Sequence, residues 1–311
     1  MVKTNHSEVS EFILLGFSKS QNLQILFFLG FSVVYVGIVL GNFFILVTVT
    51  FDSCLHTPMY FLLINLSFID MILASFATPK MIMIRDFLSD RKLISFGGCM
   101  AQIFFLHFVG GAEMVLLVTM AYDRYVAICK PLHYMTMMNR QTCIRLVSVS
   151  WAIGFVHSIS QVAFTVNLPY CGPNEVDSFF CDLPLVIKLA CVDTYVLGIL
   201  MISDSGLLSM SCFLLLLISY TVILITVQQQ AAGGVSKALS TCSAHIMVVT
   251  LFFGPCIFIY VWPFSWFSVD KVLSVFYTIF TPLLNPLIYT LRNKDMKIAM
   301  KRLRNRHVTF H

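Results

Sequence analysis

The chain has 311 residues and a formal net charge of +5, with 58% apolar residues and only 11% charged residues. A soluble globular domain carries about 25% charged residues, so this chain has too few to cover a water-exposed surface. The composition therefore excludes an ordinary soluble protein and indicates lipid as the surrounding solvent.

Seven long, mainly apolar stretches follow one another along the chain. A transmembrane helix needs about 20 such residues to cross roughly 30 Å of hydrocarbon, and every stretch is long enough. The stretches are too long for strands and lack the polar alternation of a membrane barrel. We therefore predict an all-α integral membrane protein, a seven-transmembrane helix bundle in one domain over residues 23–292. The spans are predicted near residues 23–50, 57–84, 95–129, 141–164, 195–228, 236–262 and 270–292.

Polar segments precede and follow this bundle. Residues 1–22 lack the basic-then-apolar arrangement of a cleavable signal peptide, so the first helix is expected to direct insertion. Asn5 opens an Asn-His-Ser glycosylation sequon in this tail. Residues 293–311 are basic, and Met296 and Met300 repeat at helical spacing. This pattern predicts a short amphipathic helix on the inner leaflet, with its cations facing anionic lipids.

The distribution of Lys and Arg predicts the orientation. Cytoplasmic segments near span ends carry an excess of these residues. If the N-terminus is outside, the cytoplasmic side holds more Lys and Arg than the outer side, largely because of the basic segment after Leu291. We expect a multi-pass plasma-membrane protein with an extracellular N-terminus and a cytoplasmic C-terminus.

Four of the ten cysteines fall on the predicted outer side, where disulfides persist: Cys99, Cys171, Cys181 and Cys191. Four cysteines allow three pairings, and the sequence does not choose among them. A zinc site is the rival interpretation. The ten-residue steps from Cys171 to Cys181 to Cys191 match no common zinc spacing, so disulfides are preferred.

Several strings of residues, in order along the chain, carry a family resemblance. They are Leu55–Phe61 at the start of the second span, Leu66–Asp70, Met120–Cys129 at the end of the third, Lys237–His245 at the start of the sixth and Pro282–Tyr289 in the seventh. The Asp-Arg-Tyr and Asn-Pro-x-x-Tyr pieces resemble rhodopsin-like G-protein-coupled receptors in general. The longer strings resemble the vertebrate odorant receptors, and together they cover nearly the whole chain.

Two acids are placed at membrane depth, where ionisable groups are costly and usually functional. The resemblance places Asp70 at the receptor family's sodium site, beside Asn42 and Asn285, with Glu113 as a second acid nearby. The alternative is that both acids are protonated and hydrogen-bonded within the bundle. A sodium ion is the one cofactor that the resemblance suggests.

The resemblance also implies an activation switch at the cytoplasmic end of the third helix. Arg124 would be held by Asp123 in the resting state and would open a cleft for the G protein on activation. Pro286 removes a backbone donor and kinks the last helix. The residues expected to form the switch are Asp123, Arg124, Tyr125, Tyr220, Asn285, Pro286 and Tyr289. Phe253 stands where many rhodopsin-like receptors carry a tryptophan, as is typical of odorant receptors.

A ligand pocket is expected between the third, fifth, sixth and seventh helices. Its predicted wall is His107, Gly110, Gly111, Met114, Asp204, Ser205, Leu208, Phe253, Ile257, Tyr260 and Thr278. An apolar wall with a few polar tips suits a small molecule, although a pair of small residues such as Gly110 and Gly111 is equally typical of helix packing. Asp204 either pairs with another residue of the bundle, with His107 as the suggested partner, or accepts a hydrogen bond from a donor on the ligand.

The resemblance implies a small volatile ligand and a stimulatory olfactory-type G protein that raises cyclic AMP. Membrane lipids are expected partners, nucleic acid is not, and the oligomeric state is left open. A transporter or channel is the first alternative, but the chain shows no internal repeat. An intramembrane enzyme is the second, but the sequence contains no nucleophile or metal-ligand motif.

Overall fold

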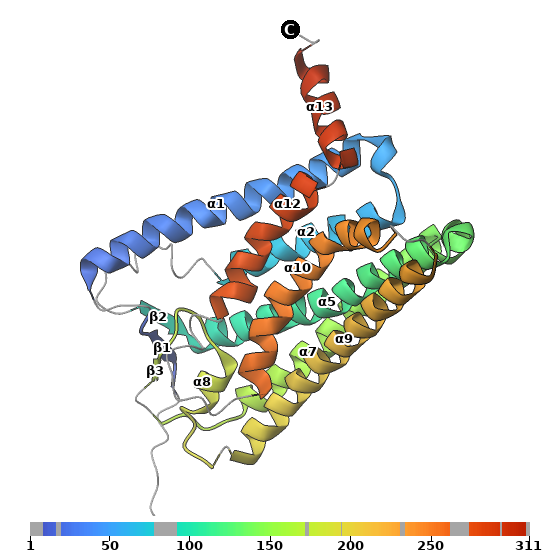
Figure 1. Cartoon of the computed structure of the whole chain (residues 1–311). Helices are drawn as coiled ribbons and strands as arrows, with labels where there is room; N and C mark the ends of the chain where they lie inside the picture. The colour runs from blue at the N-terminus through green and yellow to red at the C-terminus, as the bar shows by residue number, and fades with distance from the viewer. Residues whose placement is uncertain are drawn as a thin grey trace, which may run out of the picture.

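The computed structural model describes residues 9–16, 20–77, 92–171, 174–193, 195–230, 234–261, 274–292 and 294–308. Long helices run side by side in a bundle with a small sheet near one end (Figure 1). Among the described residues, five helices are long and apolar enough to cross a membrane, and a shorter apolar helix covers His245–Phe258. The predicted all-α membrane bundle is confirmed.

Within the described residues, seven helices overlap the seven predicted spans in order. They are α1 (Gln21–Phe51), α2 (Pro58–Ala77), α5 (Phe96–Cys129), α7 (Arg140–Val166), α9 (Tyr195–Gln230), α10 (Gly234–Val261) and α12 (Thr281–Arg292), the last preceded by the π-helical turn η3 (Phe276–Phe280). The predicted second span runs on to residue 84 and the predicted seventh begins at 270, and both of these ends lie outside the described residues.

Local sequence explains where several helices begin. Ser95 precedes α5 and accepts a hydrogen bond from the Gly98 amide at 3.1 Å. Asn139 precedes α7 and accepts one from the Thr142 amide at 2.9 Å. Pro58 occupies the first position of α2, where its missing N–H costs nothing. The short polar side chains of Ser95 and Asn139 thus satisfy backbone amides that have no partner within the helix.

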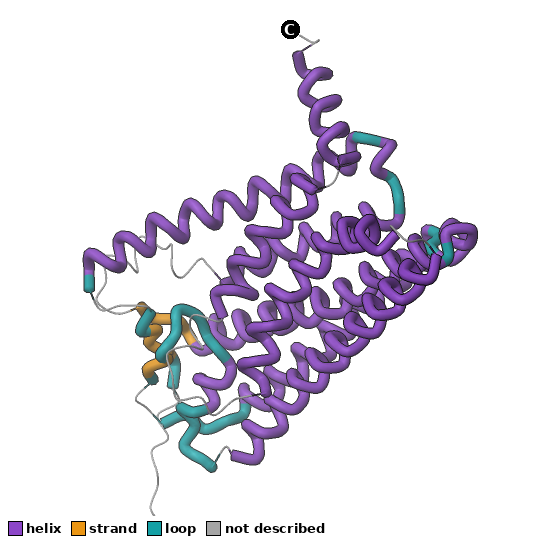
Figure 2. Tube along the Cα trace, viewed as in Figure 1, coloured by secondary structure: helices purple, strands orange, loops and turns teal. Residues whose placement is uncertain are grey.

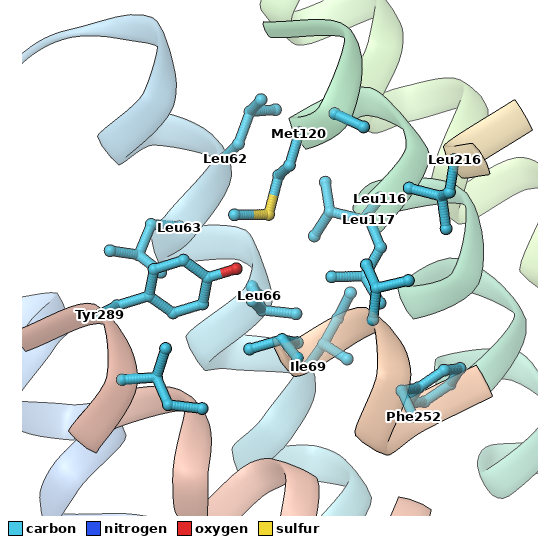
Figure 3. Packing of buried hydrophobic residues seen from close by; sticks show 14 of the residues in the cluster. Leu62, Leu63, Leu66, Ile69, Leu116, Leu117, Met120, Leu216, Phe252 and Tyr289 are labelled. Carbon is cyan, nitrogen blue, oxygen red and sulfur yellow. The ribbon is translucent and has the colours of Figure 1, made fainter. Parts of the chain in front are cut away.

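The helices pack around α5, whose buried residues extend along most of its length. Helices α5 and α7 approach each other closely at Gly154. A β-carbon added there would lie 2.3 Å from the Phe108 carbonyl oxygen and 2.6 Å from the Ala112 nitrogen. Leucine, methionine and phenylalanine side chains from several helices fill the interior between α2, α5 and α10 (Figure 3).

A small three-stranded sheet lies at one end of the helix bundle (Figure 2). Strand β1 (Glu11–Leu14) lies in the middle, antiparallel to β2 (Lys92–Ser95) and parallel to β3 (Glu175–Val176). The N-terminal segment was predicted only as a tail. Its strand was missed because four residues give no clear periodicity and both partner strands are distant in sequence.

The segment between α7 and α9 forms a structured cap joined by two disulfides. Cys99 pairs with Cys181, and Cys171 pairs with Cys191, with Cα atoms 5.5 Å and 5.6 Å apart. The short helix α8 (Leu183–Ile187) lies within this segment. The four outer cysteines are therefore all paired as disulfides, and the described residues contain no cluster of His, Cys, Asp and Glu suited to a metal ion.

The opposite end of the bundle carries short connections and the last helix. These are η1 (Ser53–Leu55), η2 (Pro131–His133), α6 (Tyr134–Met137) and α13 (Lys294–Val308). Helix α13 projects from the end far from the sheet (Figure 1). Met296 and Ala299 are buried while Lys297 and Ile298 are exposed. The helix is therefore amphipathic, as predicted from the spacing of its methionines.

Candidate functional site

Asp70 and Asn285 form a polar pair in the middle of the bundle. The Asn285 side-chain amide donates to both carboxylate oxygens of Asp70, at 3.1 Å and 2.9 Å, and both residues are buried. The Asn42 amide donates to the backbone oxygens of Ile38 and Pro282 at 3.0 Å and 3.1 Å, which ties α1 to the start of α12. Buried polar side chains thus join α12 to α1 and to α2, and the predicted sodium site at these residues stays a prediction.

Glu113 is fully buried in α5, and neither of its carboxylate oxygens has a hydrogen-bond partner among the described residues. The side-chain oxygens of Asn42 and Asn285 are likewise unpartnered within that part of the chain. Burying a polar group without a partner is costly. Carboxylate and amide oxygens are the ligands that a hard cation prefers, so this set of residues is chemically compatible with a sodium ion.

The Asp-Arg-Tyr motif lies at the end of α5 that is far from the disulfides. Asp123 is buried and its carboxylate lies 3.3 Å from the guanidinium of Arg124, which is 18% exposed. The Tyr134 hydroxyl, from α6, donates to the other carboxylate oxygen of Asp123 at 2.8 Å. Burial and the neighbouring Asp123 carboxylate raise the pKa of Tyr134, so its hydroxyl keeps the proton that it donates.

The two predicted tyrosine partners of the switch occupy different surroundings. The Tyr220 hydroxyl is hydrogen-bonded to Nδ1 of His245 on α10. Tyr289 is almost fully buried, and its hydroxyl has no hydrogen-bond partner among the described residues. Figure 3 shows that its ring lies among Leu63, Leu66 and Met120. Pro286 packs against Gly41, where an added β-carbon would lie 3.1 Å away.

The predicted pocket residues divide between open and packed positions. An added β-carbon at Gly110 would meet nothing within 4 Å, whereas at Gly111 it would lie 3.1 Å from Gly154. Gly111 therefore serves the contact between α5 and α7, the role that small residues often take. Met114, Phe253 and Thr278 are buried. His107 is bonded through Nδ1 to the backbone oxygen of Ile103 at 2.9 Å.

Asp204 has a different partner from the one suggested. Its Oδ2 atom accepts from His157 Nδ1 at 3.1 Å, from Ser160 at 2.9 Å and from Gln161 at 2.8 Å, all on α7. Ser205 accepts a further bond from Gln161 at 3.2 Å. The expectation that His107 pairs with Asp204 was wrong, because α9 turns this carboxylate toward α7 rather than toward α5.

Some predicted residues lie beyond what the structure describes. Asn5 is outside the described residues, as are the ends of two spans noted above. Tyr260 belongs to α10, but its side chain is not described, and Ile257 and Leu208 are partly buried. The glycosylation of Asn5 stays a prediction.

Five residues of these polar networks were not predicted as site residues. They are Tyr134, His157, Ser160, Gln161 and His245. His245 ends one of the family strings, and a histidine in an apolar span could have drawn attention to it and to His157. Tyr134 and Gln161 carry no such signal, because their partners are decided by how neighbouring helices pack.

A surface groove lies beside the Asp-Arg-Tyr motif. Its volume is about 460 Å³, and it is lined by Cys129, Lys130, Pro131, Leu132, His133 and Met137. Leu132 is 94% exposed. Met135 is 75% exposed as well, and neighbouring exposed apolar side chains of this kind are a feature of surfaces that bind another protein.

Comparison with known proteins gives a consistent result. A family model described as olfactory receptor matches residues 31–306. Human olfactory receptor 4K14 is 80% identical over 307 residues, which is 98% of each chain. Human olfactory receptor 4K13 is 72% identical over 97% of this chain and 99% of its own length. Human olfactory receptor 4K15 is 68% identical over 99% of this chain and 94% of its own length.

Proposed function

Because this chain belongs to the olfactory receptor family, we propose that it binds a small, volatile, mostly hydrophobic odorant within its helix bundle and activates a stimulatory olfactory-type G protein. Activation would raise cyclic AMP. The chain is a signalling receptor of a multi-pass membrane family and not an enzyme. The proposal extends to the plasma membrane, with the disulfide-bearing end outside, since disulfides persist in oxidising surroundings.

The observation that carries the coupling proposal is the arrangement around Arg124. Its guanidinium is held by Asp123, and Asp123 is held in turn by Tyr134. The groove with the exposed Leu132 lies beside this motif, on the end that carries no disulfide. A G protein that contacts this end would compete for Arg124 and for the apolar surface at the same time.

The buried acids suggest that sodium stabilises the inactive receptor. Asp70, Glu113 and the side-chain oxygens of Asn42 and Asn285 would hold the ion. A bound cation offsets the cost of burying two carboxylates in one region of the bundle. The unpartnered oxygens of Glu113 support this proposal over a purely hydrogen-bonded pair.

The function can be tested in cells that carry the receptor, the olfactory G protein and a trafficking helper. Cyclic AMP would be measured against a broad panel of volatiles, in parallel with Arg124→Ala. We expect a response in the parent that is absent from a variant of equal surface abundance. An equal response in both would contradict the role of Arg124. Ligand-dependent guanine-nucleotide exchange on added G protein would distinguish a receptor from a transporter or an enzyme, because neither alternative predicts it.

A further inference from the structure

We propose that the seam between α7 and α9 is a membrane-facing binding site for a primary ammonium group on an apolar tail, with Asp204 as its acceptor. The site differs from the pocket within the bundle, and it does not depend on the proposed signalling function. Its basis is a carboxylate that is anchored through only one of its two oxygens.

The three donors to Asp204 all converge on Oδ2, from His157, Ser160 and Gln161. No hydrogen bond to Oδ1 is seen among the described residues. An ionised carboxylate has about four acceptor positions, so the second oxygen retains its capacity. The donors orient the carboxylate without saturating it.

The anchoring groups are buried while the carboxylate is not. The side chain of His157 is 8% exposed and that of Asp204 is 48% exposed. Gln161 and Ser205 are buried behind them. The polar network thus lies inside the seam, and its acceptor faces the surroundings of the bundle.

The surroundings of Asp204 are apolar. On a helix surface, residues three and four apart are neighbours. Leu200 and Leu207 flank Asp204 on α9 in this way, and both are more than half exposed. On α7, Val156 and Phe164 flank Ser160, and they are exposed as well. An acyl or alkyl tail could lie against this rim while its head group reaches the carboxylate.

Asp204 lies in the half of α9 nearer the disulfides, since the helix begins at Tyr195 and runs to Gln230. Exposed apolar residues lie on both sides of it along the helix, from Val196 to Ile225. An ammonium head group would therefore reach the carboxylate from the disulfide-bearing end, with its tail along the apolar face of the helix.

The charge selects the ligand. No Lys or Arg in the described part of the chain forms an ion pair with Asp204. The free oxygen of the carboxylate therefore complements a cation. A primary ammonium offers three N–H donors, whereas the quaternary ammonium of phosphatidylcholine offers none. An aminophospholipid and a free long-chain amine share the required chemistry.

Native mass spectrometry of the receptor released from nanodiscs tests this site without any signalling assay. The discs would contain phosphatidylethanolamine and phosphatidylcholine with identical acyl chains. We expect several-fold enrichment of the ethanolamine lipid on the parent receptor and none on Asp204→Asn. Glu175→Gln removes one exposed negative charge elsewhere on the same end and should leave the enrichment unchanged.

A second arm needs no variant, in case Asp204→Asn folds poorly. Retention of mono-, di- and trimethylated ethanolamine lipids should fall as N–H donors are lost. Dodecylamine should displace the lipid if both bind at this site. If the parent binds dodecylamine but shows no lipid enrichment, and Asp204→Asn does not bind dodecylamine, the ligand is a free amine. Equal retention across the methylated series, together with no dependence of dodecylamine binding on Asp204, would overturn the proposal.

Discussion

Among single residues, Glu113 has the least support from its neighbours, since both carboxylate oxygens are buried and unpartnered among the described residues. A ligand that binds only the folded state stabilises it by an amount that grows with ligand concentration. We expect the melting temperature of the purified receptor to rise when sodium chloride replaces choline chloride. Glu113→Gln should abolish this rise, because the amide brings no charge to the ion.

Asp193→Asn is the matched control for this experiment, because it removes an exposed acid two residues before α9 begins. It should keep the full response to sodium. If the parent melts at the same temperature in both salts, the two buried acids are instead protonated, and the sodium proposal fails.

Tyr134 is the residue that links the Asp-Arg-Tyr motif to the following connection. Its hydroxyl donates to Asp123, and a hydrogen bond to a charged group contributes about 1.5–3 kcal/mol. Tyr134→Phe should loosen Asp123 and release Arg124 more often. We expect higher nucleotide exchange on the G protein in the absence of any odorant, by roughly tenfold for each 1.4 kcal/mol lost.

Tyr195→Phe is a suitable control, since it makes the same chemical change at an exposed site at the start of α9. Its ligand-free exchange should match that of the parent. A Tyr134→Phe receptor with normal basal exchange and normal surface abundance would show that Tyr134 does not restrain Arg124.

At the level of helices, the contact between α5 and α7 depends on glycines, and Gly154 has the least space of them. Gly154 leaves no space for a β-carbon, because backbone atoms of Phe108 and Ala112 would lie within 2.6 Å of it. Backbone cannot move aside as a flexible side chain can, so Gly154→Ala must push the two helices apart. We expect a loss of several kcal/mol of stability, since overpacking a well-packed core typically costs about 1–3 kcal/mol even where side chains can adjust.

Gly110→Ala provides the comparison on the partner helix, because an added β-carbon there meets nothing within 4 Å. Alanine is the better helix former by about 0.8–1.0 kcal/mol, so this variant should melt at or above the temperature of the parent. Thermal unfolding in detergent would measure both. Equal melting temperatures for Gly154→Ala and the parent would contradict the tight contact.

For the molecule as a whole, the sheet and the disulfides connect parts of the chain that are far apart in sequence. Phe12 on β1 is fully buried and packs edge-on against Tyr170 at 5.4 Å. Truncating a buried phenylalanine costs about 3–5 kcal/mol. We expect Phe12→Ala to lower the melting temperature and the number of receptors at the cell surface.

Glu11→Ala changes the neighbouring exposed position of the same strand and should have little effect. If Phe12→Ala behaves like Glu11→Ala, the N-terminal strand does not stabilise the cap. A combined loss of surface expression in both variants would instead point to a role of the strand in membrane insertion.

The sequence by itself determined the membrane bundle, the amphipathic last helix and the family. Apolar run length decides between a membrane-spanning and a soluble helix, and this property is local. The strings around Asp123, Asp70 and Asn285 are also continuous in sequence, so the residues of the proposed switch and of the buried acid region could be named before their geometry was known.

Only the tertiary structure decided which partners these residues take. Asp204 contacts His157 rather than His107, and the pairing of Cys99 with Cys181 follows from how the cap lies on the bundle. The rotation of one helix against another determines such contacts, and a shift of one residue turns a side chain by about 100°. A helical pattern predicts which face is buried, whereas the contacts across that face depend on distant segments that the local sequence does not encode.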